Sequence, residues 1–229
     1  MRPAEPGLAP GGPPVDVLVM VPALEPAGAR AELQAMLGAT RAAALRRALI
    51  ARTAQWAAEV APGRVHVAYG APETESSLTT LLGAGGAQLF LQSGTDPSRR
   101  LAHATHQVFA AAEGAVLIVW PSLPCWRPEH AAAALGDLAA GADVALGPVF
   151  DGGFYLVALR RPIPAVLALP EATWTSPDAM GTALDVIQAS GLDLGLLGAE
   201  RGLRRASDVR AALADPLLDA ELRTILGGA

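Results

Sequence analysis

The chain contains 229 residues, and its 52% hydrophobic and 17% charged residues are typical of a folded protein with a sizeable core rather than of a disordered chain. Its net charge of −5 argues against nucleic acid as a partner, because a phosphate backbone attracts basic surfaces. The single cysteine, Cys125, excludes an internal disulfide and a multi-cysteine metal site, and it suits a protein of the reducing cytoplasm.

The start of the chain differs in composition from the rest. Residues 3–14, "PAEPGLAPGGPP", are rich in proline and glycine and lack the apolar centre of a secretory signal, so they predict a disordered tail. The apolar runs further along fall well short of the roughly 20 residues that span a bilayer. We therefore expect a tail over residues 1–14, one domain over residues 15–229, no membrane contact and a cytoplasmic location.

Apolar runs with strand character recur along the chain, and helical patterns separate most of them. In chain order we expect strands at residues 15–23, 64–70, 87–92, 114–120, 142–147 and 153–159. Helices are expected at residues 40–60, with Thr40 as the N-cap, and at residues 98–113, 128–140 and 177–190. This alternation predicts an α/β fold with a largely parallel sheet covered on both faces.

Ligands of such sheets bind at the carboxyl ends of the strands, so the loops that follow the strands are where functional residues are expected. The loop after the first strand, "PALEPAGARAEL", contains neither the dinucleotide-binding G-x-G-x-x-G pattern nor a P-loop. The chain also lacks G-x-S-x-G and H-E-x-x-H patterns. His103 and His106 lie three residues apart in a predicted helix, a spacing that suits a metal, but no third ligand accompanies them.

One loop places a single carboxylate beside two glycines. In "ADVALGPVFDGGFYLVAL", residues 142–159, Asp151, Gly152 and Gly153 lie between two predicted strands. In a functional interpretation, Asp151 accepts a hydrogen bond from a hydroxyl or acts as a base, and the glycines let the backbone approach a ligand. In a structural interpretation, the three residues form a turn in which the aspartate bonds the amides ahead of it. The motif alone leaves both open.

Several segments together resemble a known bacterial family: "GAVLIVW", "PSLPCWRPEH", the 142–159 stretch, "WTSPDAM" and "GLDLGLLGAERGLRRASDVRAAL". The family is that of the glycosyltransferase-like proteins associated with arsenosugar biosynthesis, distant relatives of the molybdenum-cofactor and phospholactate guanylyltransferases. The resemblance extends from Val15 to Leu213 and is most specific at GP-x-x-DGG-[FY]-Y-L. It implies the nucleotide-diphospho-sugar transferase fold of GT-A type, a three-layer α/β/α sandwich over a mixed, mostly parallel sheet.

The resemblance also implies metal-assisted transfer from a nucleotide-activated donor, in which Mg²⁺ or Mn²⁺ held by aspartates neutralises the departing diphosphate. This chain departs from that pattern. Ser122 stands where the family has a metal-binding aspartate, and Arg204 and Arg205 stand where a second acidic motif is expected. A serine hydroxyl does not replace a carboxylate for a hard cation, so we expect no metal ligands here.

The basic residues with which relatives bind phosphates are altered as well. Of the phosphate-binding cations that relatives carry after the first strand, this chain keeps only Arg30. Glu32 stands where relatives have an arginine. Arg100 keeps the arginine that relatives place before the next helix. The loss of cations predicts weaker phosphate binding, since each charge-assisted hydrogen bond contributes about 1.5 to 3 kcal/mol.

The tryptophans and the paired arginines each have two interpretations. Trp174 either stacks on a base or sugar, or merely precedes a helix that Ser176 and Pro177 begin. Trp120 and Trp126 are expected to fill the vacated pocket rather than to bind a ligand. Arg205, with Arg204 beside it, is either a cationic replacement for the metal or a solvated pair at a helix start.

Two functions remain. The first is transfer from a nucleotide-activated donor such as a nucleotide-sugar, with Asp151 against the sugar or acceptor and with Arg30, Arg100 or Arg205 carrying anionic charge. The remaining site residues would be Ser122, Gly152, Gly153 and Trp174. The second is a catalytically silent domain of the same fold that binds a metabolite or a partner protein. The missing aspartate at Ser122 favours either the silent domain or a metal-independent mechanism.

Overall fold

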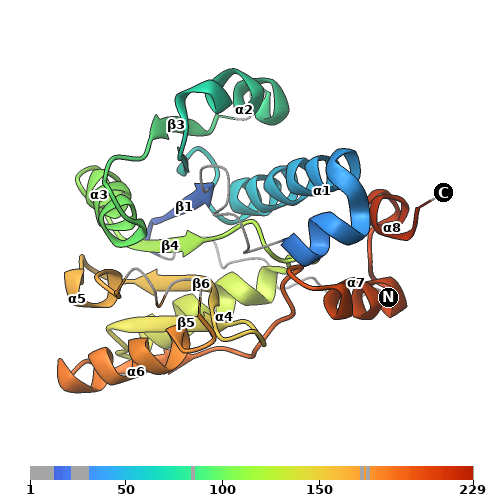
Figure 1. Ribbon diagram of the computed structural model, residues 1–229. Coiled ribbons are helices and arrows are strands. Elements are labelled where there is room, and N and C mark those ends of the chain that lie inside the picture. Colours follow the sequence, from blue (N-terminus) through green and yellow to red (C-terminus); the bar gives the residue numbers. More distant parts are fainter. Residues whose placement is uncertain (1–12, 22–30, 84–85, 171–172, 174–175, 229) are drawn as a thin grey trace, which may run out of the picture.

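A seven-stranded sheet forms the centre of the molecule (Figure 1), in a computed structural model that describes residues 13–21, 31–83, 86–170, 173 and 176–228. The strands are β1 (Val15–Val21), β2 (Val65–Tyr69), β3 (Gln88–Leu91), β4 (Ala115–Val119), β5 (Val144–Pro148), β6 (Phe154–Leu159) and β7 (Leu194–Leu196). Their order across the sheet is β3-β2-β1-β4-β6-β5-β7. Every neighbouring pair is parallel except the two that β6 makes with β4 and β5. The predicted α/β fold with a mixed, mostly parallel sheet is confirmed.

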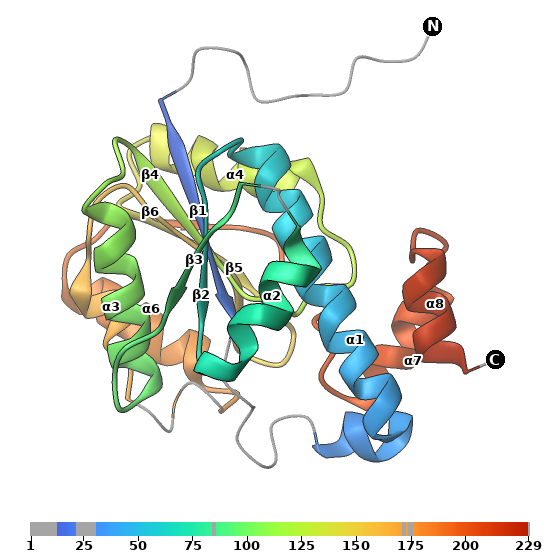
Figure 2. The same cartoon turned by 90° about the horizontal axis from the view of Figure 1, so that it is seen from above.

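Helices cover both faces of this sheet. They are α1 (Ala31–Val60), α2 (Glu75–Leu82), α3 (Pro97–Phe109), α4 (Pro128–Ala139), α5 (Pro164–Leu167), α6 (Ala179–Ala189), α7 (Ala206–Ala214) and α8 (Ala220–Gly227), with a short 3-10 helix, η1 (Pro72–Thr74). Figure 2 shows α3 and α6 on one side of the strands and α1, α2 and α4 on the other. Among the described helices, none combines the length and the apolar character needed to cross a bilayer.

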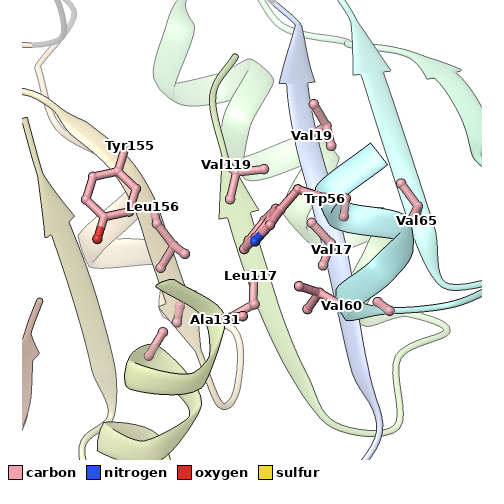
Figure 3. Close-up of a cluster of buried hydrophobic side chains, with 14 of the residues drawn as sticks. Val17, Val19, Trp56, Val60, Val65, Leu117, Val119, Ala131, Tyr155 and Leu156 are labelled. Atoms are coloured by element: carbon pink, nitrogen blue, oxygen red, sulfur yellow. The ribbon is translucent and has the colours of Figure 1, made fainter. Parts of the chain in front are cut away.

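The strands are apolar on both faces because each face packs against helices. On β1, Val17 and Val19 belong to the core under α1 and α4, where Trp56 contributes the largest ring (Figure 3). Their neighbours Leu18 and Met20 point to the opposite face and join the core under α3 and α6. Successive side chains of a strand alternate between faces, so a continuous apolar run such as residues 15–21 is what a doubly covered strand requires.

A third apolar cluster joins the first part of α1 to α7 and α8, and sequence analysis did not predict these two last helices. Leu33, Leu49, Leu203 and Leu222 are among its buried members. The helix predicted from Thr40 begins earlier, at Ala31, and is broken at Gly38, which has φ 76°. A left-handed residue of this kind is easiest for glycine, and it redirects the first turns of α1 so that they join this cluster.

The remaining differences from the predicted elements concern short segments. Strand β7 has three residues and α2 has eight, too few for a clear hydrophobic period. The helix predicted at residues 177–190 begins at Ala179, because the Ser176 hydroxyl bonds the Asp178 amide at 3.0 Å and extends the preceding turn.

The ends of the strands define the position of the site. All parallel strands end at one edge of the sheet, called the carboxyl edge below, and the antiparallel β6 begins there. The strand order reverses between β1 and β4, and such a switch point opens a crevice for ligands. The segment that follows β4 therefore lies beside this crevice, and the loop before β6, the other neighbour of β4, lies next to it.

Gly152 is the tightest point of the loop between β5 and β6. It has φ 95°, and a Cβ added there would lie 1.9 Å from the carbonyl oxygen of Pro177. We predict that Gly152→Ala lowers the free energy of unfolding by more than about 2 kcal/mol, from backbone strain and overlap. Urea denaturation measures this. Gly181→Ala is the matched control, because nothing lies within 4 Å of its added Cβ and alanine favours the helix. Equal stability of the two variants would contradict the packing described.

Candidate functional site at the carboxyl edge

Three segments that are far apart in the sequence are bonded together at the carboxyl edge. After β4, the Ser122 carbonyl accepts a hydrogen bond from the Leu203 amide at 2.9 Å. After β5, the Phe150 amide donates to the Glu200 carbonyl at 3.1 Å, and the Glu200 amide donates to the Pro148 carbonyl at 2.9 Å. The loop of residues 149–153 and the segment of residues 198–205 are thus fixed against each other and against Ser122.

Asp151 lies at the centre of this arrangement. Its Oδ2 is 3.2 Å from Nε of Arg204, and its Oδ1 is 3.5 Å from the Gly153 amide. The loop closes on itself, since the Val149 amide donates to the Gly153 carbonyl at 2.9 Å. The backbone thus adopts the turn of the structural interpretation. The carboxylate, with its side chain only 14% exposed, is neutralised by an arginine that sequence analysis had not paired with it.

Ser122 is buried beside Gly202, and its hydroxyl oxygen makes no hydrogen bond within the described part of the structure. The donor set around it does not suit Mg²⁺ or Mn²⁺. Those ions require several carboxylate or carbonyl oxygens, whereas Ser122 offers a hydroxyl and Asp151 is engaged by a guanidinium. Across the described residues no three His, Cys, Asp or Glu side chains come close enough to share an ion.

The N-terminus of α7 is filled by the chain's own carboxylates. Asp208 is buried and accepts from the amides of Arg204 and Arg205, at 3.1 Å and 2.8 Å. It also binds Nη1 of Arg201 at 3.2 Å. Glu32, from the first turn of α1, accepts from the Ala206 amide at 3.2 Å. Glu32 therefore holds α1 to α7, a structural role that sequence analysis missed, and the exposed Arg205 side chain stands at a helix start.

Arg100 belongs to the other half of the carboxyl edge. It lies within the first turns of α3 rather than before that helix, and its Nε donates to the Gly94 carbonyl at 3.0 Å. It follows β3, which is at the opposite end of the sheet from β5 and β7. The structure therefore groups Ser122, Asp151 and Arg204, with Arg100 standing apart. Arg30 and Trp174 lie outside the described residues.

The tryptophans of the β4–α4 loop pack against neighbouring side chains, and Trp126 also lines an open pocket together with Trp56 and Cys125. Trp126 stacks on Trp56 with ring centroids 4.2 Å apart, and its indole donates to Oγ1 of Thr53 at 2.9 Å. Trp120 packs against the core under α3 and α6. Both rings contribute to packing, and their expected role of filling a vacated ligand pocket stays a prediction. Burial raises the pKa of the neighbouring Cys125 thiol, which makes it a weak nucleophile.

A histidine that sequence analysis did not single out anchors this half of the site. Nδ1 of His130 accepts from the Arg127 amide at 3.2 Å, so Nε2 carries the proton and donates to Oε1 of Glu200 at 3.1 Å. Glu200 also pairs with Arg127. Burial lowers the pKa of His130, and burial raises the pKa of the adjoining Tyr155 to about 12. This network fixes Glu200, whose backbone in turn holds Phe150.

Ser122, Asp151 and His130 lie within a stretch that matches a known family model, whereas Arg204 lies beyond it. Residues 53–176, more than half of the chain, match the model DUF2064, "Uncharacterized protein conserved in bacteria". The chain belongs to the DUF2064 family. No curated protein matches the sequence of this DUF2064 member.

Solved structures share the fold of this DUF2064 chain. One, from Desulfovibrio desulfuricans G20, bears the name "putative nucleotide-diphospho-sugar transferase"; it is 23% identical, with a TM-score of 0.79 over 93% of this chain and 94% of that one. A cytidylyltransferase from Leptospira borgpetersenii serovar Hardjo-bovis is 8% identical, with a TM-score of 0.56 over 94% and 93%. A CMP:2-keto-3-deoxy-manno-octonic acid synthetase complexed with CTP is 15% identical, with a TM-score of 0.54 over 88% and 97%.

At these identities the likeness establishes the fold alone. The expected nucleotide-diphospho-sugar transferase fold is therefore confirmed for this DUF2064 chain. The association with arsenosugar biosynthesis and the relation to the guanylyltransferases stay expectations from the sequence.

The lowered pKa of His130 predicts a dependence of stability on pH. In the unfolded chain the histidine binds a proton with a pKa of 6.5, whereas in the folded chain burial makes protonation of His130 less favourable. The free energy of unfolding should therefore fall as the pH drops below about 6.5 and through the lower folded pKa. We predict that His130→Gln makes this fall shallower in urea denaturation between pH 7.5 and 5, and that His106→Gln, at an exposed position of α3, leaves it unchanged. An unchanged slope in the His130 variant would show that this side chain is not the source.

Proposed function

We propose that this DUF2064 protein binds a nucleotide-activated sugar at the carboxyl edge and transfers a group from it without a divalent cation held by carboxylates. The fold supports this proposal, because its solved counterparts include proteins named as a nucleotide-diphospho-sugar transferase and a cytidylyltransferase. The position of the site supports it as well, since Ser122 follows β4 at the switch point and Asp151 precedes β6, the strand next to β4.

The ion pair between Arg204 and Asp151 is the observation that carries the metal-independent form of the proposal. A departing diphosphate accumulates negative charge, which must be met by a cation or by several hydrogen-bond donors. The Arg204 side chain is 36% exposed and holds a positive charge against Asp151, while the preceding Leu203 is bonded to the Ser122 carbonyl. In this proposal Asp151 accepts from a hydroxyl of the sugar or acceptor, and arginines carry the charge of the phosphates.

The second candidate is a catalytically silent domain of the same fold. It is favoured by the same ion pair, because one oxygen of the Asp151 carboxylate is already occupied by a guanidinium. Such a domain would bind a metabolite or a partner protein at this edge without turning it over. The two candidates differ in turnover and share the expectation that ligand binding does not depend on a divalent ion.

Thermal unfolding against nucleoside triphosphates and nucleotide-sugars, each with EDTA and with Mn²⁺, tests the proposal. We expect at least one compound to stabilise the protein by about 2.7 kcal/mol at a hundredfold excess over its Kd. We expect the same stabilisation in EDTA and in Mn²⁺. A panel without any stabilising compound would contradict nucleotide binding, and stabilisation seen only with Mn²⁺ would contradict its metal independence.

A variant sharpens the same experiment. Ser122→Asp combined with Arg204→Gln supplies a second carboxylate and frees the first, so we expect Mn²⁺ alone to raise the melting temperature of this variant and not that of the wild type. Ser122→Asn combined with Arg204→Gln is the matched control, with the same shape and one charge fewer. A folded variant indifferent to Mn²⁺ would show that position 122 does not face Asp151 as an ion ligand would.

A further inference from the structure

An exposed aromatic ring adjoins Asp151 at the carboxyl edge. Phe150 is 66% exposed, and among the large hydrophobic side chains that the structure describes as exposed it is the only aromatic one. Exposing an aromatic ring to water costs free energy, and an exposed apolar side chain beside a site often marks a binding surface. Neither the turn nor the ion pair of Asp151 uses this ring.

The ring is held in place before any ligand arrives. The Phe150 amide is bonded to the Glu200 carbonyl at 3.1 Å, and the following Gly152 packs directly against Pro177. The guanidinium of Arg201 lies 5.2 Å from the centroid of the Phe150 ring, and Arg201 is itself held by Asp208 at 3.2 Å. A ring fixed in this way loses little freedom when a ligand covers it, which favours binding.

The charges around the ring compensate one another. Three arginines at this edge are each paired with a carboxylate inside the protein: Arg127 with Glu200, Arg201 with Asp208, and Arg204 with Asp151. The exposed Arg205 adds one positive charge, and Glu32, bonded to the amide that follows it, adds one negative charge. An anionic sugar ring placed on Arg127, Arg201 or Arg204 would have to displace an internal carboxylate, whereas an uncharged sugar ring would not.

We infer that Phe150 is the platform for an uncharged sugar ring, with hydroxyls bonded to Asp151 and Arg204. The face of a phenyl ring carries partial negative charge and attracts the C–H groups on the flat side of a pyranose. A carboxylate and a guanidinium beside it supply the acceptor and the donors that hydroxyls need. This inference rests on the proposed function, because it names the class of sugar or acceptor that the same site would take.

Saturation-transfer NMR on the full chain tests the inference, with the methyl pyranosides of glucose, galactose and mannose as probes. We expect at least one of the three pyranosides to bind the wild type. Phe150→Ala should weaken the affinity for that pyranoside about tenfold, which corresponds to a loss of about 1.4 kcal/mol of stacking energy. Phe150→Trp should keep the affinity within about threefold. Leu217→Ala, at a side chain 74% exposed in the segment between α7 and α8, is the control and should change nothing.

A charged probe decides between the neutral ligand and an anion. The methyl glycoside of glucuronic acid, whose charge lies on the pyranose itself, should bind no more tightly than methyl glucoside, and a gain of tenfold or more would overturn the inference. Equal binding by the wild type and Phe150→Ala, or no binding by any of the three pyranosides, would also overturn it. Stabilisation by CTP, which contains no pyranose, is measured separately on the same variants. If CTP or another nucleotide without a pyranose stabilises Phe150→Ala as it does the wild type, nucleotide binding is supported independently of the role proposed for the Phe150 ring.

Discussion

The ion pair between Arg204 and Asp151 is the constraint on which the carboxyl edge depends. It joins the loop between β5 and β6 to the segment that leads into α7, while the neighbouring Leu203 amide is bonded to the Ser122 carbonyl. The exposures of its two side chains, 36% and 14%, leave the pair within reach of a ligand yet partly shielded from water. Such a pair is stronger than one at the open surface, and it orients both groups.

The supporting contacts extend this principle around the site. Glu200 is held by His130 and Arg127, and Asp208 by the amides at the start of α7. Each buried or half-buried carboxylate here has a cation or an amide as its partner, which offsets the cost of removing it from water. One chemical result is an edge with little net charge and an exposed aromatic ring, an environment suited to a neutral ring with hydroxyls. A second is that the Asp151 carboxylate is already engaged by a guanidinium.

The sequence predicted the larger elements because they have a physical signature. Doubly covered strands such as β1 and β4 are continuous apolar runs, and the resemblance at residues 147–156 indicated the right fold. The sequence could not pair Arg204 with Asp151 or give Glu32 its role at α7, because such contacts join residues far apart in the chain. Nor could it predict α8, whose apolar side chains are explained only by the cluster that they share with α1. The departure from the family pattern at Ser122 stays a prediction, to which the structure adds a buried hydroxyl without a hydrogen bond among the described residues.

A double-mutant cycle on Asp151→Asn and Arg204→Gln tests the central claim most directly, because it isolates the energy that the two side chains share. The free energies of unfolding of the wild type, both single variants and the double variant would be measured in urea at low ionic strength. A coupling energy of about 1 kcal/mol that diminishes in high salt is expected for a partly shielded pair. Fully additive variants, with no salt-dependent coupling, would contradict the claim that this ion pair holds the carboxyl edge together.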